Sequence, residues 1–98
     1  MPAYVIADAT IHDMEKHRAA FLPAVDKLIA QMGAKILART GNPIHLGYGG
    51  GWLNNRRMVL LEFENSQKAR EWFEKLQHLP DPDNMTRHST VILEGIEH

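Results

Sequence analysis

The fold is decided by one stretch of sequence, residues 57–64, which reads Arg57-Met58-Val59-Leu60-Leu61-Glu62-Phe63-Glu64. It is the most apolar of four segments whose composition and two-residue period are typical of β-strands. Working outward, the other three segments are residues 3–11, 34–40 and 89–96. Two stretches with helical spacing of apolar residues separate them. The order strand, helix, strand, strand, helix, strand predicts a ferredoxin-like α+β sandwich, with both helices on one face of an antiparallel four-stranded sheet.

Local signals place the ends of both helices. Asp13 can accept hydrogen bonds from the first free amides of a helix that runs to about Met32, and Gly33 is its expected stop. Pro23 lies inside this helix and predicts a kink or a break, because proline lacks a backbone donor and clashes with the preceding turn. The second helix is capped by Ser66 or Asn65.

The strands predict a sheet with two different faces, since alternate side chains point to opposite sides. One parity is almost purely apolar and is expected to pack under the helices: Val5, Ala7, Ala9, Ile11, Ile36, Ala38, Val59, Leu61, Phe63, Val91, Leu93 and Gly95. The other parity mixes apolar and charged residues: Tyr4, Ile6, Asp8, Thr10, Lys35, Leu37, Arg39, Met58, Leu60, Glu62, Thr90, Ile92 and Glu94. This second face is expected to line a pocket or a subunit interface.

Length and composition exclude several classes of protein. Ninety-eight residues with 44% hydrophobic and 23% charged residues predict one globular domain spanning residues 1–98. The formal net charge of −1 argues against a nucleic-acid partner, and the absence of cysteine excludes disulfides, thiolate metal sites and a cysteine nucleophile. With no membrane-length apolar run and no signal-peptide pattern at the start, we expect a cytoplasmic protein without a membrane partner.

Five blocks of residues resemble one known family. They are Met1-Pro2-Ala3-Tyr4-Val5-Ile6-Ala7, Leu37-Ala38-Arg39-Thr40-Gly41, Met58-Val59-Leu60-Leu61-Glu62-Phe63, Ala69-Arg70-Glu71-Trp72-Phe73 and Val91-Ile92-Leu93-Glu94-Gly95. Together they resemble the family catalogued as domain of unknown function 1330. The resemblance covers nearly the whole chain and implies membership of the dimeric α/β-barrel superfamily, whose small ferredoxin-like protomers pair through their sheets.

The resemblance implies a homodimer and leaves the reaction open. Relatives in the wider superfamily include cofactor-free monooxygenases, muconolactone-type isomerases, dehalogenating enzymes and haem-handling proteins. Family members often carry a Gly-Asp-Trp element before the third strand, whereas Gly50-Gly51-Trp52 here lacks the acid.

The charged parity supplies the candidate catalytic residues. Taking the first and third strands as parallel neighbours, we expect Asp8 and Glu62 near one end of the face, where two close carboxylates would raise the pKa of one of them and create a general acid or base. His45, beside the glycine-rich segment 47–51, is a third candidate for proton transfer. The candidate substrate-binding residues are Arg39, which can hold a carboxylate, with Tyr4, Glu94 and the loop residue Trp52.

Two functions remain open from the sequence. The first is a cofactor-independent isomerase, lyase or monooxygenase acting on a small organic acid or phenol. The second is a non-catalytic ligand-binding or structural dimerisation module, in which the same charges only set the register of the dimer. No cofactor and no metal site are expected, because His12 and His17 do not share a helix face and no metal-binding spacing occurs among the six histidines.

Overall fold

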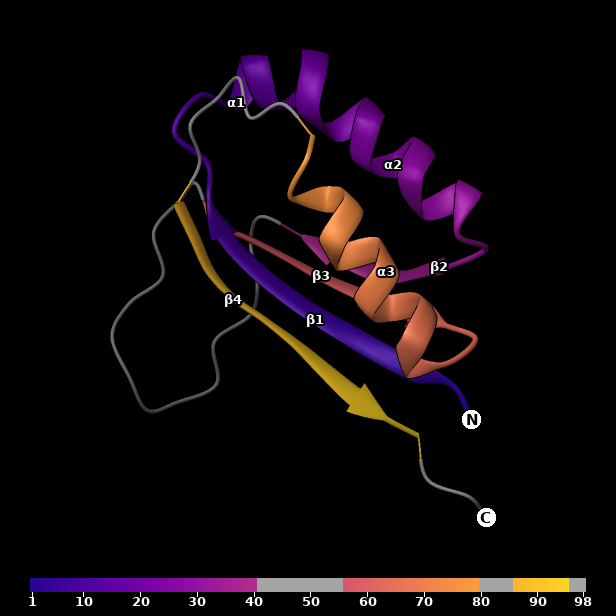
Figure 1. Ribbon diagram of the computed structural model, residues 1–98. Helices are drawn as coiled ribbons and strands as arrows, with labels where there is room; N and C mark the ends of the chain where they lie inside the picture. The colour runs from indigo at the N-terminus through magenta and orange to yellow at the C-terminus, as the bar shows by residue number, and fades with distance from the viewer. Residues whose placement is uncertain (41–55, 80–85, 96–98) are drawn as a thin grey trace, which may run out of the picture.

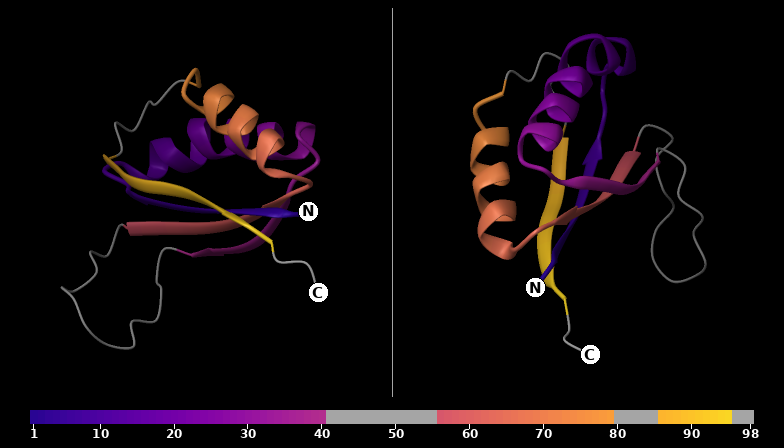
Figure 2. Two further views of the ribbon diagram at one scale, coloured as in Figure 1. Left: turned by 60° about the horizontal axis from the view of Figure 1, so that its bottom comes forward. Right: turned by 90° about the vertical axis from the view of Figure 1, so that its right-hand side faces the viewer.

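The computed structural model describes residues 1–40, 56–79 and 86–95. For Thr40, Arg56 and residues 86–88 it describes the backbone alone. A single layer of strands is covered by helices on one face, as Figures 1 and 2 show. The elements in chain order are β1 (Ala3–Thr10), α1 (Met14–Lys16), η1 (His17–Phe21), α2 (Leu22–Gln31), β2 (Lys35–Thr40), β3 (Arg56–Phe63), α3 (Ser66–Leu76) and β4 (Thr86–Glu94).

The sheet has the strand order β2-β3-β1-β4, and every neighbouring pair is antiparallel. With α2 and α3 on the same face, this is the ferredoxin-like βαββαβ arrangement, so the predicted fold class is confirmed. The expectation that β1 and β3 are parallel was wrong, because the register joins Ala3 to Phe63 and Thr10 to Arg56. The helical connection between β1 and β2 makes these two strands parallel and leaves a gap between them in the sheet. The strand β3 occupies this gap and is antiparallel to both.

The first helix, predicted to kink or break at Pro23, is instead continuous in backbone conformation and changes its hydrogen-bonding pattern there. Pro23 occupies the first turn of α2, and the chain immediately before it forms the π-helical turn η1, in which the Leu22 amide donates to the His17 carbonyl. A widened turn accommodates the proline ring and its missing donor. The flanking signals hold: the Asp13 carboxylate accepts from the Lys16 amide at 3.1 Å, and Gly33 takes a φ of 69° after α2.

The helix α3 begins where its cap predicts. The Asn65 side chain accepts from the Lys68 amide at 2.9 Å, which selects Asn65 over Ser66 as the capping residue. Its buried face carries Ala69, Trp72 and Leu76, and the Trp72 ring lies 5.6 Å from that of Phe63 on the sheet. The core between sheet and helices also includes Val5, Leu61, Phe21, Leu28 and Ile29.

The predicted faces are correct in β1 and β3 and wrong in β4. Val5 pairs with Ile92, so Ile92 lies on the helix face and packs against the core. Val91 and Leu93 lie on the open face instead and are 45% and 52% exposed. Three consecutive apolar residues fit either parity, and pairing with β1 decides between them.

A β-bulge reverses the faces within β2. Ile36 pairs with Leu61 and Ala38 pairs with Leu60, so Leu37 is an extra residue without a partner on β3. One extra residue shifts every later side chain to the opposite face. Arg39 therefore pairs with Val59 and lies on the helix face, whereas the sequence pattern predicted the open face. None of the described helices is long and apolar enough to cross a membrane.

Candidate functional site

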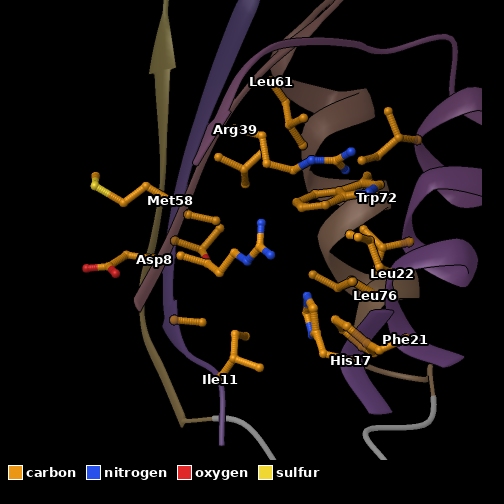
Figure 3. Close-up of a pocket in the computed structure, with 17 residues that line it drawn as sticks. Asp8, Ile11, His17, Phe21, Leu22, Arg39, Met58, Leu61, Trp72 and Leu76 are labelled. Atoms are coloured by element: carbon orange, nitrogen blue, oxygen red, sulfur yellow. The ribbon is translucent and has the colours of Figure 1, made fainter. Parts of the chain in front are cut away.

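A cavity of about 110 Å³ lies between the sheet and the helices. Its walls are largely apolar and come from β1, β3, η1, α2 and α3, as Figure 3 shows. The apolar lining includes Phe21, Val25, Ile29, Leu61 and Leu76. Four polar or charged residues of the helix side, His17, Arg39, Arg57 and Thr90, line the same space, and so does Trp72. The sequence predicted that the open face lines a pocket or a subunit interface, and this cavity lies on the other, helix-covered face.

Arg57 is the least compensated charge of this cavity. It stands at the start of β3 on the same parity as Val59, Leu61 and Phe63, which directs it toward the helices. Its Nε is buried without a hydrogen-bond partner, and its Nη2 lies 3.4 Å from the weakly accepting Sδ of Met14. Burial, together with the charges of Arg18 and Arg39, lowers the pKa of the Arg57 guanidinium. An anion beside Arg57 would relieve both effects.

Arg39 reaches the cavity from the neighbouring strand because of the bulge at Leu37. Its side chain extends from the sheet toward the helices in Figure 3. There its Nη1 forms an ion pair of 2.6 Å with the Asp26 carboxylate of α2, and the two side chains are 32% and 40% exposed. The positive charge of Arg39 is therefore already matched by a carboxylate at the mouth of the cavity.

His17 is brought into the cavity by the π-helical turn. It is 5% exposed, and its ring lies 5.4 Å from that of Phe21 at an angle of 39°. The extra backbone unit of a π-turn rotates the side chains before it relative to those after it, and such turns are frequent at functional sites. His17 is the one titratable imidazole that lines this cavity within the described part of the chain.

Trp72 supplies a second buried donor. The residue is 2% exposed, and its Nε1 has no hydrogen-bond partner among the described residues. A buried indole N–H normally finds an acceptor, because leaving it unpaired costs about 1–3 kcal/mol. The cavity thus presents two buried N–H groups, on Arg57 and Trp72, that a ligand oxygen can satisfy.

The two predicted catalytic carboxylates are not brought together. Asp8 borders the cavity through its backbone, but its carboxylate points away from it, on the side of Met58 in Figure 3. Glu62 pairs with Tyr4, four residues along β1 from Asp8, which separates the two positions by roughly 13 Å. This distance removes the geometric basis for a shared proton. Their individual roles stay predictions.

The remaining predicted site residues are dispersed. Tyr4 lies on the open face between Glu62 and Leu93, and Glu94 pairs with Ala3 near the end of β4. Tyr4, Glu62 and Lys35 therefore share one end of the sheet. Glu94 lies at this same end, because its partner Ala3 is adjacent to Tyr4, whereas Arg39 pairs with Val59 nearer the other end of the sheet. His45 and Trp52 lie outside the described residues.

Arg57 and His17 are not among the site residues predicted from the sequence, although signals for both exist in it. Arg57 continues the apolar parity of β3, so a charged residue at that position is directed to the core side. His17 lies between Met14 and Phe21 at the spacing of the apolar stripe of the first helix. Among the residues that the structure describes, no three His, Cys, Asp or Glu side chains lie close enough together to hold a metal ion.

Comparison with known proteins agrees with the resemblance in the sequence. The model of the family described as "Domain of unknown function (DUF1330)" matches residues 2–96. This match spans every element from β1 to β4. No curated protein matches the chain.

Proposed function

The chain belongs to the DUF1330 family, and we propose that it is an enzyme of the isomerase or lyase type that transfers a proton on a small organic acid or phenol held between sheet and helices. The observation that carries the proposal is the cavity itself: a buried histidine and a half-buried arginine, whose Nε has no hydrogen-bond partner among the described residues, face one apolar space. Convergence of a few polar groups in an apolar pocket is the usual form of a small-molecule site.

His17 is the proposed acid or base. Imidazole is the side chain best suited to accept and return protons near neutral pH. Its burial in an apolar wall and its contact with the Phe21 ring limit its rotation. A positioned imidazole can remove a proton from a carbon or a phenolic oxygen and return it to another atom of the same molecule. The net result of these two proton transfers is an isomerisation.

Arg57 is the proposed anion-binding residue. Its charge stabilises both the bound acid and the negative charge that builds up when a proton is removed. Because the apolar walls exclude water, this interaction is stronger than the same pair would be at the surface. Arg57 and His17 are preferred over Asp8 and Glu62 because both side chains line one cavity on the helix side of the sheet. Arg57 is preferred over Arg39, which lines the same cavity, because the charge of Arg39 is already matched by Asp26.

Proton exchange in D₂O tests this function without knowledge of the product. We expect wild-type protein to replace a C–H hydrogen of some members of a panel of 2-oxo acids, unsaturated acids and phenols by deuterium, as followed by proton NMR. His17→Gln should abolish this exchange, and His78→Gln, at an exposed position after α3, should not change it. Equal exchange in wild type and His17→Gln would refute the assignment.

We also propose that the protein forms a homodimer through the open face of the sheet. The register places Val91, Ile6, Leu60 and Ala38 side by side across all four strands as one apolar row. The rows on either side contain the charged residues Glu62 with Lys35, and Asp8. An exposed apolar centre with a polar rim is typical of an interface between copies.

A charge in the apolar row tests the dimer. Val91→Glu should convert the dimer to a monomer in sedimentation velocity, because burial of an unpaired carboxylate opposes association. Arg70→Glu, at an exposed position of α3, is the matched control and should leave the dimer intact. A wild-type monomer at micromolar concentration, or a dimer that survives Val91→Glu, would contradict this interface.

A further inference from the structure

Among the described residues, the charged side chains on the helix side of the cavity carry one uncompensated positive charge; the Asp8 carboxylate, which belongs to a residue that also borders the cavity, points away from it (Figure 3). Arg39 and Arg57 are permanently protonated side chains that line it. The charge of Arg39 is matched by Asp26 at 2.6 Å. Within the part of the chain that the structure describes, no carboxylate lies within ion-pair distance of Arg57. Arg18, the other cation that acts on Arg57, is exposed and does not line the cavity.

The unpaired donors point to an oxygen ligand. The Arg57 Nε and the Trp72 Nε1 are buried and have no hydrogen-bond partner among the residues that the structure describes. A carboxylate satisfies a guanidinium with charge-assisted hydrogen bonds, about twice as strong as neutral ones. An additional acceptor oxygen of the ligand can satisfy the indole N–H. A neutral ligand would leave the Arg57 charge uncompensated. The second negative charge of a dianion would find no available cation here, because the charge of Arg39 is already paired with Asp26.

The volume limits the rest of the ligand. An apolar protein cavity of about 150 Å³ accommodates a benzene molecule. The cavity here, at about 110 Å³, is smaller and is open at one side. The enclosed space therefore holds fewer than the six carbon atoms of a benzene ring, so a ring of that size would extend in part through the open side, with its charged group near Arg57.

From these three observations we infer that the cavity is selective for small monocarboxylates. The single carboxylate of such an acid binds Arg57, and its compact apolar body packs against α2 and α3. This inference rests on the proposed function, because it names the substrate class of the same pocket. It goes further by excluding dicarboxylates and phenols as the preferred ligands.

Calorimetric titration with three related probes tests the charge requirement. The probes are benzoate, its neutral analogue benzamide and its dianionic analogue terephthalate. We expect benzoate to bind the wild-type protein at least about tenfold more tightly than either analogue, which corresponds to about 1.4 kcal/mol. Benzamide binding as tightly as benzoate, or no binding of benzoate at millimolar concentration, would overturn the inference.

Variants on either side of the cavity test the residues. In Arg57→Met, benzoate should lose its advantage over benzamide, and in Arg57→Lys, which keeps the charge but lacks the Nε, part of the advantage should remain. Arg70→Met, an exposed arginine of α3, should bind as wild type does. An advantage that persists in Arg57→Met with native circular dichroism would refute the role of Arg57. Loss of the advantage in Arg70→Met as well would show a non-specific charge effect and refute it too.

Asp26→Asn tests the charge count directly. Removal of the Asp26 carboxylate releases Arg39, so the cavity would then carry two uncompensated positive charges. Terephthalate should gain affinity relative to benzoate by about tenfold in this variant. An unchanged ratio would refute the count of one charge. His17→Gln should keep benzoate binding, so failure of the exchange assay with intact benzoate binding overturns the proton-transfer function and leaves the monocarboxylate preference standing.

Discussion

Replacement of Arg57 by methionine should make the protein more stable while removing its ligand. The Arg57 Nε is a buried donor without a partner, and such a group lowers stability by about 1–3 kcal/mol. Methionine keeps an unbranched apolar stem of similar reach and adapts to irregular space. The change removes one weak contact, the 3.4 Å approach of Nη2 to the Met14 Sδ.

The balance of these terms predicts a net gain. Subtracting about 0.5–1 kcal/mol for the lost sulfur contact leaves a stabilisation of about 1 kcal/mol. For a domain of this size that corresponds to a rise in Tm of roughly 4–8 °C. Relief of the repulsion between Arg57 and its two neighbouring arginines acts in the same direction.

Thermal unfolding followed by circular dichroism is the assay, at one fixed protein concentration because dimerisation would also shift the Tm. Arg70→Met is the control, since it removes an exposed arginine that lines no cavity, and its Tm should stay within about 2 °C of wild type. A lower Tm for Arg57→Met than for wild type would refute the reasoning, because it would mean that the guanidinium stabilises the fold. Binding sites that are suboptimal for stability are common in proteins, since the groups that hold a ligand lack partners without it.

Three further changes test the fold by urea unfolding. Leu61→Ala, at a position that is 0% exposed under the helices, should lower the free energy of unfolding by about 2–5 kcal/mol, and a loss below 1 kcal/mol would argue against that burial. Asn65→Ala should lower it by about 1 kcal/mol through loss of the α3 cap, whereas an equal loss in Ser66→Ala would contradict the assignment of the cap. Gly33→Ala should lower it by about 1–2 kcal/mol from backbone strain alone, because the φ is 69° and no atom lies within 4 Å of the added Cβ; a neutral result would show that the turn relaxes.

The predicted fold depended on signals that lie within short windows of sequence. The apolar period of residues 57–64, the caps at Asp13 and Asn65, and the stop at Gly33 each depend on a few neighbouring residues. Local conformational preferences and local hydrogen bonds decide such features, so they can be read without knowing what the segment packs against. The change in hydrogen-bonding pattern before Pro23 belongs to the same group.

The site depended on long-range pairing instead. Val91-Ile92-Leu93 is apolar in both parities, and only the pairing of Ile92 with Val5 decides which side faces the helices. No glycine or proline near Leu37 indicates the bulge in the sequence, yet the bulge moves Arg39 from one face of the sheet to the other. Asp8 and Glu62 were separated for the same reason, since strand direction sets which residues are neighbours.

By itself, the sequence determined the number and order of the strands and helices, the ends of the helices and the family to which the chain belongs. The tertiary structure decided which face of each strand is buried, where the cavity lies, and that His17, Arg57 and Trp72 share it. The physical reason is that local backbone preferences act over a few residues. Strand register and the convergence of side chains arise only when segments distant in the chain pack together.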